Sequence, residues 1–257
     1  MENSIAIRLN EKNNYTKINI WYAWIYFIFY SFCGFMLETL FGIFSKGVLE
    51  SRQSFLFGPF CIVYGIGALL MIIFLSNLKD KPIALFLFSI IIGTITEYLM
   101  SYFCELLFHF KWWDYSELSL NINGRICLYF SIIWGFLGIL LIKYINPLFD
   151  KFIQFLKSKI NIKILKLSLL LLIALLIFDA SITAVALKSF YSKIINDFNL
   201  DIATTKKYFT IKSELFAEEN MVLTFPNMQI AGTKYNNIYI ANLYKSEKAY
   251  YFQIFEN

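Results

Sequence analysis

The strongest constraint on this chain is a series of long apolar runs separated by short polar clusters. Each run holds about 20 residues, the length that a helix needs to cross the hydrocarbon core of a bilayer. They are too long and too continuous to be the buried strands of an α/β core. The runs occupy residues 21–44, 58–76, 82–107, 126–149 and 167–187. We therefore predict an all-α integral membrane helical bundle with about five transmembrane helices, which has the lipid bilayer as its main partner.

Composition supports lipid as the solvent and excludes several functions. The chain is 58% hydrophobic and 16% charged, whereas a soluble domain of this length needs more polar surface. Its net charge of +5 comes from cations between the apolar runs rather than from a basic stripe, so we expect no nucleic-acid partner. The cysteines form neither a CxxC pair nor a metal-ligand spacing, and we predict no metal and no cofactor.

The distribution of cations predicts the orientation of the chain. Short cytoplasmic loops of membrane proteins hold an excess of Lys and Arg. With a cytoplasmic N-terminus, the inner segments hold Arg8, Lys12, Lys17, Lys79, Lys81, Lys151, Lys157, Lys159, Lys163 and Lys166. The outer loops then hold Lys46, Arg52, Lys111 and Arg125. We predict a cytoplasmic N-terminus and an extracytoplasmic C-terminal tail.

This orientation divides the chain into a series of segments. They are a cytoplasmic leader (1–20), a four-helix transmembrane core (21–149), a basic cytoplasmic connection (150–166), a fifth transmembrane helix (167–187) and an extracytoplasmic tail (188–257).

The tail has a different pattern from the apolar runs. Its hydropathy falls, and an amphipathic piece near 189–215 precedes short alternating runs that are typical of strands. The alternating runs are 221–225, 238–244 and 249–255, with possible turns at 236–237 and 245–246. We predict a small β-rich or α+β tail. No internal repeat indicates a transporter built from two halves.

Three acids lie inside the apolar runs, where ionisable residues are costly and are often functional. They are Glu38, Glu97 and Asp179. Their helices run in the same direction, and each acid lies about 13–15 residues past the cytoplasmic end, which corresponds to roughly 20 Å along a helix. We expect the acids at a similar depth in the outer half of the membrane, with Asp179 the weakest site candidate.

A polar stripe surrounds one of these acids. Gly93, Glu97, Ser101, Glu105 and His109 recur every four residues, so they share one slowly drifting face of a helix. Such a face should meet protein or water rather than lipid. Glu97, Ser101 and Glu105 are therefore candidates for binding a ligand, a proton or a cation. His109 ranks lower, because a solvated histidine in an aromatic belt explains it as well as a proton relay does.

Two arginines of the outer loops, Arg52 and Arg125, are the cations that can pair with these acids. An arginine also binds a carboxylate or a phosphate through two parallel donors. The sequence leaves open whether Arg125 with Glu97, and Arg52 with Glu38, form a ligand site or purely structural ion pairs.

The start of the second run contains Gly58-Pro59, which interrupts a helix. Non-helical backbone at membrane depth is tolerated where it is buried in protein or lines a cavity. The alternative is a loop followed by Pro in the first turn of a helix. Both interpretations remain open at this point.

Several motifs in order resemble a known family. They are Ser54-Phe55-Leu56-Phe57-Gly58-Pro59 with Tyr64-Gly65-Ile66-Gly67-Ala68, Glu97-Tyr98, Trp112-Trp113-Asp114-Tyr115-Ser116 and Asn123-Gly124-Arg125-Ile126-Cys127-Leu128.

Together they resemble the bacterial membrane family labelled "putative ABC-transporter type IV" over about residues 20–150, with a possible extension at 225–228. The resemblance implies a multi-pass protein of the bacterial plasma membrane, with other membrane subunits as possible partners. Asp114, inside a matching motif, joins the lower-ranked candidates. The chain has no GxxxxGK[ST] phosphate loop, so any ATP hydrolysis requires a separate ATPase subunit.

Three functions remain in competition. The first is a transporter or permease-like component with an outward-facing polar cavity formed by Glu38, Glu97, Glu105, Arg52 and Arg125. The second is a non-transporting interaction or assembly protein whose tail binds a partner. The third, a membrane-embedded enzyme acting on lipid head groups, ranks lowest, because the sequence has no nucleophile–base pair and no HExxH motif. We predict no catalytic residue.

Overall fold

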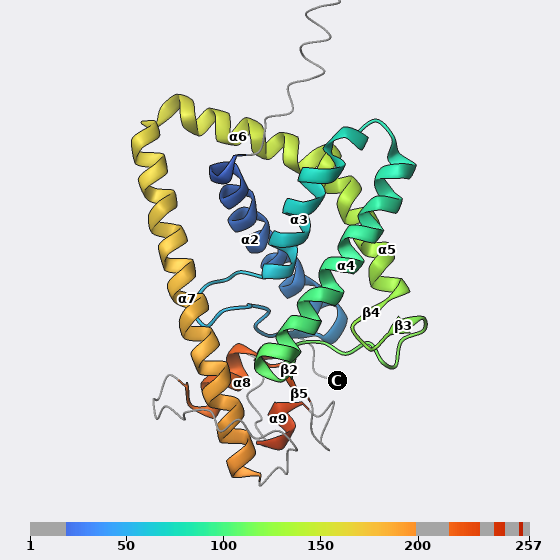
Figure 1. Ribbon diagram of the computed structural model, residues 1–257, viewed down its shortest axis with the longest axis vertical. Helices are drawn as coiled ribbons and strands as arrows, with labels where there is room; N and C mark the ends of the chain where they lie inside the picture. The colour runs from blue at the N-terminus through green and yellow to red at the C-terminus, as the bar shows by residue number, and fades with distance from the viewer. Residues whose placement is uncertain (1–18, 199–215, 232–238, 245–251, 254–257) are drawn as a thin grey trace, which may run out of the picture.

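The computed structural model describes residues 19–198, 216–231, 239–244 and 252–253, and it is mostly helical (Figure 1). The helices in chain order are α2 (Ile20–Lys46), α3 (Ile62–Leu75), α4 (Pro82–Phe108), α5 (Leu128–Leu140), α6 (Asn146–Lys159) and α7 (Ile162–Asp197). The 3-10 turn η1 (Ser76–Leu78) follows α3, and the π-helical segment η2 (Leu141–Ile145) joins α5 to α6.

Four helical segments of the described chain are long and apolar enough to cross a membrane. They are Ile20–Lys46, Pro82–Phe108, Leu128–Lys159 and Ile162–Asp197. The second predicted run forms a shorter apolar helix, Ile62–Leu78. It is short because the chain from Glu50 to Cys61 is not helical. The structure thus contains a multi-helix membrane architecture.

Helix ends follow local sequence signals. Asn19 caps α2, since its side chain accepts a hydrogen bond from the backbone N–H of Tyr22, and Gly47 ends this helix in the left-handed conformation with φ 71°. Pro82 opens α4, where its missing N–H costs nothing. His109 ends α4 with φ 61°, an unusual conformation for a residue with a side chain.

The central bundle packs α2, α3, α4 and α5 around one apolar cluster. Its members include Tyr26, Met71, Leu85 and Trp134. Gly93 allows α4 and α5 to approach closely, because a Cβ atom at this position would lie 2.3 Å from Cγ of Trp134. Small residues commonly mediate such close approach of membrane helices.

Helix α6 runs across one end of this bundle and leads to α7, which stands to one side (Figure 1). Polar contacts with α2 fix α6 in this position. Tyr26 donates a hydrogen bond to Asp150, and Tyr30 donates one to Asn146. Part of the predicted basic connection 150–166 is therefore helical and packed against the bundle.

The chain between α2 and α3 forms an irregular segment beside α7. Strand β1 (Val48–Leu49) pairs antiparallel with β6 (Phe252–Gln253). Pro59 precedes Ile62, the first residue of α3, so it does not lie in the first turn of that helix. The interpretation with Pro in the first turn of a helix is therefore wrong. The backbone at Gly58-Pro59 is non-helical, with Pro59 exposed, and its depth in the membrane stays a prediction.

A short hairpin links α4 to α5. It pairs β3 (Asn121–Ile122) with β4 (Ile126–Cys127). Its turn needs left-handed backbone at Asn123 (φ 55°) and Gly124 (φ 66°), which these residue types adopt readily.

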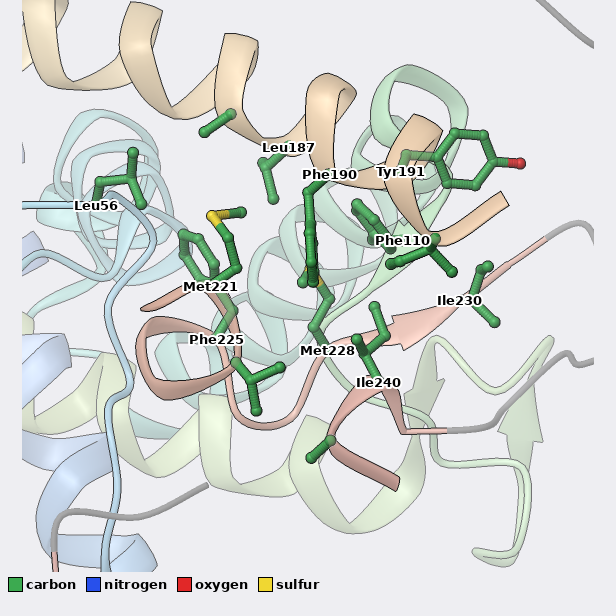
Figure 2. Close-up of a cluster of buried hydrophobic side chains, with 14 residues drawn as sticks. Leu56, Phe110, Leu187, Phe190, Tyr191, Met221, Phe225, Met228, Ile230 and Ile240 are labelled. Carbon is green, nitrogen blue, oxygen red and sulfur yellow. The ribbon is translucent and has the colours of Figure 1, made fainter. Parts of the chain in front are cut away.

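The described part of the tail packs at the opposite end of the molecule from α6 (Figure 1). It contains α8 (Glu218–Thr224), β5 (Gln229–Ile230) and α9 (Ile240–Leu243), and β5 pairs with β2 (Phe110–Lys111). Figure 2 shows the cluster that unites it with the end of α7, in which Phe110, Phe190, Met221, Met228 and Ile230 meet.

Two predicted strands of the tail were wrong. Most of the run 221–225 belongs to α8, and 240–243 within the run 238–244 belongs to α9. In both cases the buried residues lie on one side of a helical turn, as with Met221, Val222 and Phe225. Alternation over a few residues does not distinguish this pattern from a strand.

Other expectations for the termini are tested in part. Within the run 249–255 the described pair Phe252–Gln253 is strand β6. Helix α7 continues ten residues past the predicted end at 187, to Asp197, because Phe190, Tyr191 and Ile194 pack in the tail cluster. The remainder of the amphipathic piece (199–215), the turns at 236–237 and 245–246 and leader residues 1–18 lie outside the described residues.

Candidate functional site

A cavity of about 530 Å³ lies between α2, the segment before α3, the first turn of α3, α4, residues 112–115, α5, α7 and the tail. This volume is in the range of small-molecule sites. Its wall is mainly apolar and includes Phe41, Met100, Phe103, Leu137 and Leu187. The charged residues of its lining, in the part of the chain that the structure describes, are Glu38, Lys46, Arg52, Glu97 and Asp114.

Glu38 and Arg52 meet at the wall formed by α2. The Arg52 Nη1 atom lies 4.0 Å from Oε2 of Glu38, and the Tyr64 hydroxyl donates to Oε1 of Glu38 at 2.5 Å. The predicted pairing of Glu38 with Arg52 is therefore present, although 4.0 Å is a long contact for an ion pair.

Arg52 has a second carboxylate partner, Glu50, which accepts a hydrogen bond from its Nη2 atom. Glu50 also accepts from Lys46 at 2.9 Å. Asn227 of the tail binds Lys46 and Glu50. Its amide oxygen accepts from Lys46 at 2.8 Å, and its amide nitrogen donates to Glu50 at 3.2 Å. This network, which we call the tail latch (Lys46, Glu50 and Asn227), connects the tail to the cavity wall.

Glu97 has a different environment. Only 6% of the residue is exposed, and its carboxylate accepts from the Tyr115 hydroxyl at 2.9 Å and from Nε1 of Trp134 at 3.1 Å. Burial and the nearby Glu97 carboxylate raise the pKa of the Tyr115 hydroxyl, so this hydroxyl remains a donor at neutral pH. No Lys, Arg or His of the described residues lies within 4.0 Å of the Glu97 carboxylate.

Asp114 lines the cavity beside Trp113 and Tyr115. Its Oδ1 accepts from the backbone N–H of Ser116 at 3.0 Å. A Cβ atom on Gly124 would lie 2.3 Å from this oxygen, so the glycine of the hairpin turn makes room for the carboxylate. Asp114 forms no ion pair with a described residue.

Arg125 pairs with Glu105 rather than with Glu97. Its Nη1 atom lies 2.6 Å from Oε2 of Glu105, and its guanidinium lies 5.7 Å from the ring centres of Tyr98 and Tyr102. Neither Arg125 nor Glu105 lines the cavity, and the pair fastens the hairpin to α4. Ser101 is buried on the same helix and is also outside the lining.

Asp179 binds backbone instead of lining the cavity. It accepts from the N–H groups of Phe57 and Gly58, with the shortest contact at 2.8 Å from Gly58, and from the Thr183 hydroxyl at 3.3 Å. The Thr183 hydroxyl in turn accepts from the N–H of Leu56. Asp179 and Thr183 together provide the hydrogen-bond acceptors for three backbone N–H groups of the irregular segment before α3.

His109 lies where α4 meets the tail. Its ring stacks on Tyr191 with centres 4.7 Å apart, and its carbonyl accepts from the N–H of Ala231 at 2.9 Å. Burial lowers the pKa of His109, partly opposed by Glu105. His109 therefore connects the end of α4 with α7 and with the tail, and it does not line the cavity.

Sequence reasoning did not select several polar residues of the site. Tyr64, Tyr115 and Trp134 hold the two cavity glutamates, and Glu50 and Asn227 form the latch. Tyr64 and Tyr115 lie in the motifs quoted for the family resemblance, and Asn227 lies in its extension at 225–228, so the resemblance was the available signal. Across the described ranges, no group of three His, Cys, Asp or Glu side chains is placed to hold a metal ion.

Comparison with known proteins gives one match. Searches of curated proteins and of solved structures returned no match. A family model described as "Putative ABC-transporter type IV" matches residues 25–184, which include most of α2, all of α3 to α6, most of α7 and every charged residue of the cavity lining. This match covers more than half of the chain, which therefore belongs to the family of that description.

Proposed function

We propose that this chain is a membrane-embedded component of a transport system and that the cavity is its ligand-binding chamber. In this proposal the chain crosses a bacterial plasma membrane five times, including α3 with the irregular segment before it. The N-terminus lies in the cytoplasm and the tail outside. ATP hydrolysis, where it drives transport, comes from a separate subunit.

The observation that carries the proposal is a buried glutamate inside a cavity of ligand size. Charges at membrane depth are costly and commonly mark the path of a substrate or an ion. Glu97 faces a space of about 530 Å³ instead of being enclosed by packed side chains. A purely structural acid needs no such space, as Asp179 demonstrates within the same molecule.

In this proposal the tail controls access to the chamber. Phe225, Pro226 and Asn227 line the cavity on the side away from α6. The apolar residues of α8 and α9 are already covered by the end of α7, which leaves them unavailable for an outside partner. This favours a closing role for the tail over the alternative of an interaction protein.

Single-cysteine labelling tests whether the chamber is accessible to water. In a background without other cysteines, we expect a membrane-impermeant thiol reagent to modify Met100→Cys and the native Cys104, which line the cavity. Ser101→Cys, which is buried beside them, and the outward-facing Ile95→Cys and Leu99→Cys are matched controls that should stay unlabelled. A cavity closed to water would leave position 100 as silent as the controls.

Transport requires more than access from one side. Inside-out and right-side-out vesicles distinguish a transporter from a one-sided binding protein, because a transport chamber must open alternately to both sides. We expect Cys104 to react in both kinds of vesicle. Reaction from the tail side alone, in energised and de-energised membranes alike, would contradict the transport role.

A further inference from the structure

The charge and shape of the cavity also indicate what it binds. This inference rests on the proposed function, since it names the substrate class of the same chamber. We propose that the ligand is an amphipathic organic cation, an ammonium or similar cationic group on an apolar body, and that Glu97 is its counter-charge.

The first argument is the balance of charge around the cavity. The two bases of its lining, Lys46 and Arg52, are both bound to Glu50, and Arg52 also faces Glu38. The two remaining acids, Glu97 and Asp114, have no base within 4.0 Å among the described residues. The lining therefore holds more acidic groups than basic ones.

The surroundings of Glu97 indicate that this acid is the one that would bind a cation. A buried carboxylate without a cationic partner is costly, and the two hydrogen bonds from Tyr115 and Trp134 use one acceptor site on each oxygen. A carboxylate has about four such sites. Glu97 can therefore accept further hydrogen bonds from a ligand, and a cationic ligand would also neutralise its charge.

The second argument is the aromatic surface around the glutamate. Trp134 and Tyr64 lie with ring centres 5.2 Å apart, and Tyr115 stacks on Phe130 at 4.7 Å. All four residues line the cavity. Aromatic faces attract cations and are the usual lining of sites for quaternary ammonium groups.

The third argument is the size and polarity of the cavity, which favour a larger ligand with an apolar body. A proton or a hydrated metal ion would leave most of an apolar space of about 530 Å³ unfilled. An anion would meet the carboxylates of Glu97 and Asp114. The N-terminus of α3 also faces this space, but a helix dipole amounts to about half a charge and is outweighed by these two acids.

Two probes of the same shape and opposite charge test the inference directly. We would measure binding of tetraphenylphosphonium and of tetraphenylborate to the purified full chain in lipid nanodiscs, after subtracting the partition into empty nanodiscs. We expect saturable binding of the phosphonium cation and none of the borate anion. Equal binding of both probes, preference for the borate, or no binding of either would overturn the inference.

A pair of variants on one helix then assigns the counter-charge. Glu97→Gln keeps the size of the side chain and one acceptor oxygen but removes its charge, and we expect phosphonium affinity to fall more than about tenfold. Glu105→Gln, two turns further along α4 and outside the cavity, should bind like the unaltered chain. Retained affinity in a Glu97→Gln protein with an unchanged melting temperature would also overturn the assignment.

The outcomes separate this inference from the proposed function. If Met100→Cys labels from the tail side but neither probe binds, the chamber remains and the cationic ligand is wrong. If Met100→Cys does not label, the chamber itself is wrong. The comparison of the two probes needs no variant, so a folding defect of Glu97→Gln cannot conceal the result.

Discussion

Asp179 and Glu97 are both 6% exposed, but their partners give them different roles. Asp179 accepts hydrogen bonds from backbone N–H groups and from Thr183. Glu97 accepts from two aromatic side chains and faces a cavity. The sequence identifies both as acids within apolar runs and ranks Asp179 lower. It does not show their different partners, because most of these are far away along the chain.

Replacing Asp179 with Ala should destabilise the protein. The N–H groups of Phe57 and Gly58 lose their acceptor, and each unsatisfied buried donor costs about 1–3 kcal/mol. We expect a lower melting temperature in detergent or nanodiscs. Ser181→Ala, on an exposed position of the same helix, is the control and should change little. Equal stability of the two variants would show that Asp179 does not hold the irregular segment.

Titration of His109 should make the contact between α4 and the tail sensitive to pH. Burial lowers the pKa of this residue below its ordinary value of 6.5, so the unfolded or detached state binds the proton more tightly. Stability must then fall as the pH falls below about 6.5. We expect faster limited proteolysis of the tail at pH 5 than at pH 7.5. His109→Asn, which tolerates the left-handed backbone but does not titrate, should weaken this difference.

At the scale of elements, α4 demonstrates what periodicity can predict. The stripe at intervals of four residues correctly indicated a helix with a polar face against protein. The structure divides that face, because Gly93 packs against Trp134, Glu105 pairs with Arg125, and the cavity is lined by Glu97, Met100 and Cys104. Spacing identifies a face, whereas the neighbouring helices determine which part of it remains open.

The contact between α4 and α5 should be sensitive to one methyl group. Gly93→Ala places a Cβ atom 2.3 Å from the base of the Trp134 side chain, where the ring cannot move without moving its helix. We expect a destabilisation of about 1–3 kcal/mol, the usual cost of overpacking, measured by thermal unfolding. Gly67→Ala meets the tip of the same ring at 3.1 Å and should cost clearly less. The reverse order would contradict the packing described for this interface.

At the scale of the whole molecule, the membrane class and most helix positions follow from apolar length and composition. The helical α8 and α9, the pairing of Arg125 with Glu105 and the position of Asn227 at the cavity do not. Each depends on contacts between segments that are distant in sequence, such as Asn227 with Lys46. No local pattern encodes these contacts, although the family motifs contain some of the participating residues.

Breaking the tail latch should open the cavity. Asn227→Ala removes the side chain that joins the tail to Lys46 and Glu50. We expect faster modification of Cys104 by a water-soluble thiol reagent in a background where Cys104 is the single cysteine. Asn242→Ala, at an exposed position of α9, should leave the rate unchanged. Equal rates for the two variants would mean that the latch does not limit access.

The irregular segment before α3 has a consequence for how this family can diversify. Three successive backbone N–H groups, from Leu56 to Gly58, are bonded to Thr183 and Asp179 of α7. The shape of this stretch is thus held from another helix, together with the side chains of Gln53 and Ser54, which bond to the backbone of Leu56 and Ile62. Substitutions at these bonded positions would disturb the fold as well as the cavity wall. Natural variation in ligand preference is therefore expected to concentrate at other lining positions, such as Met100 and Phe103, while Asp179 and Thr183 stay constant.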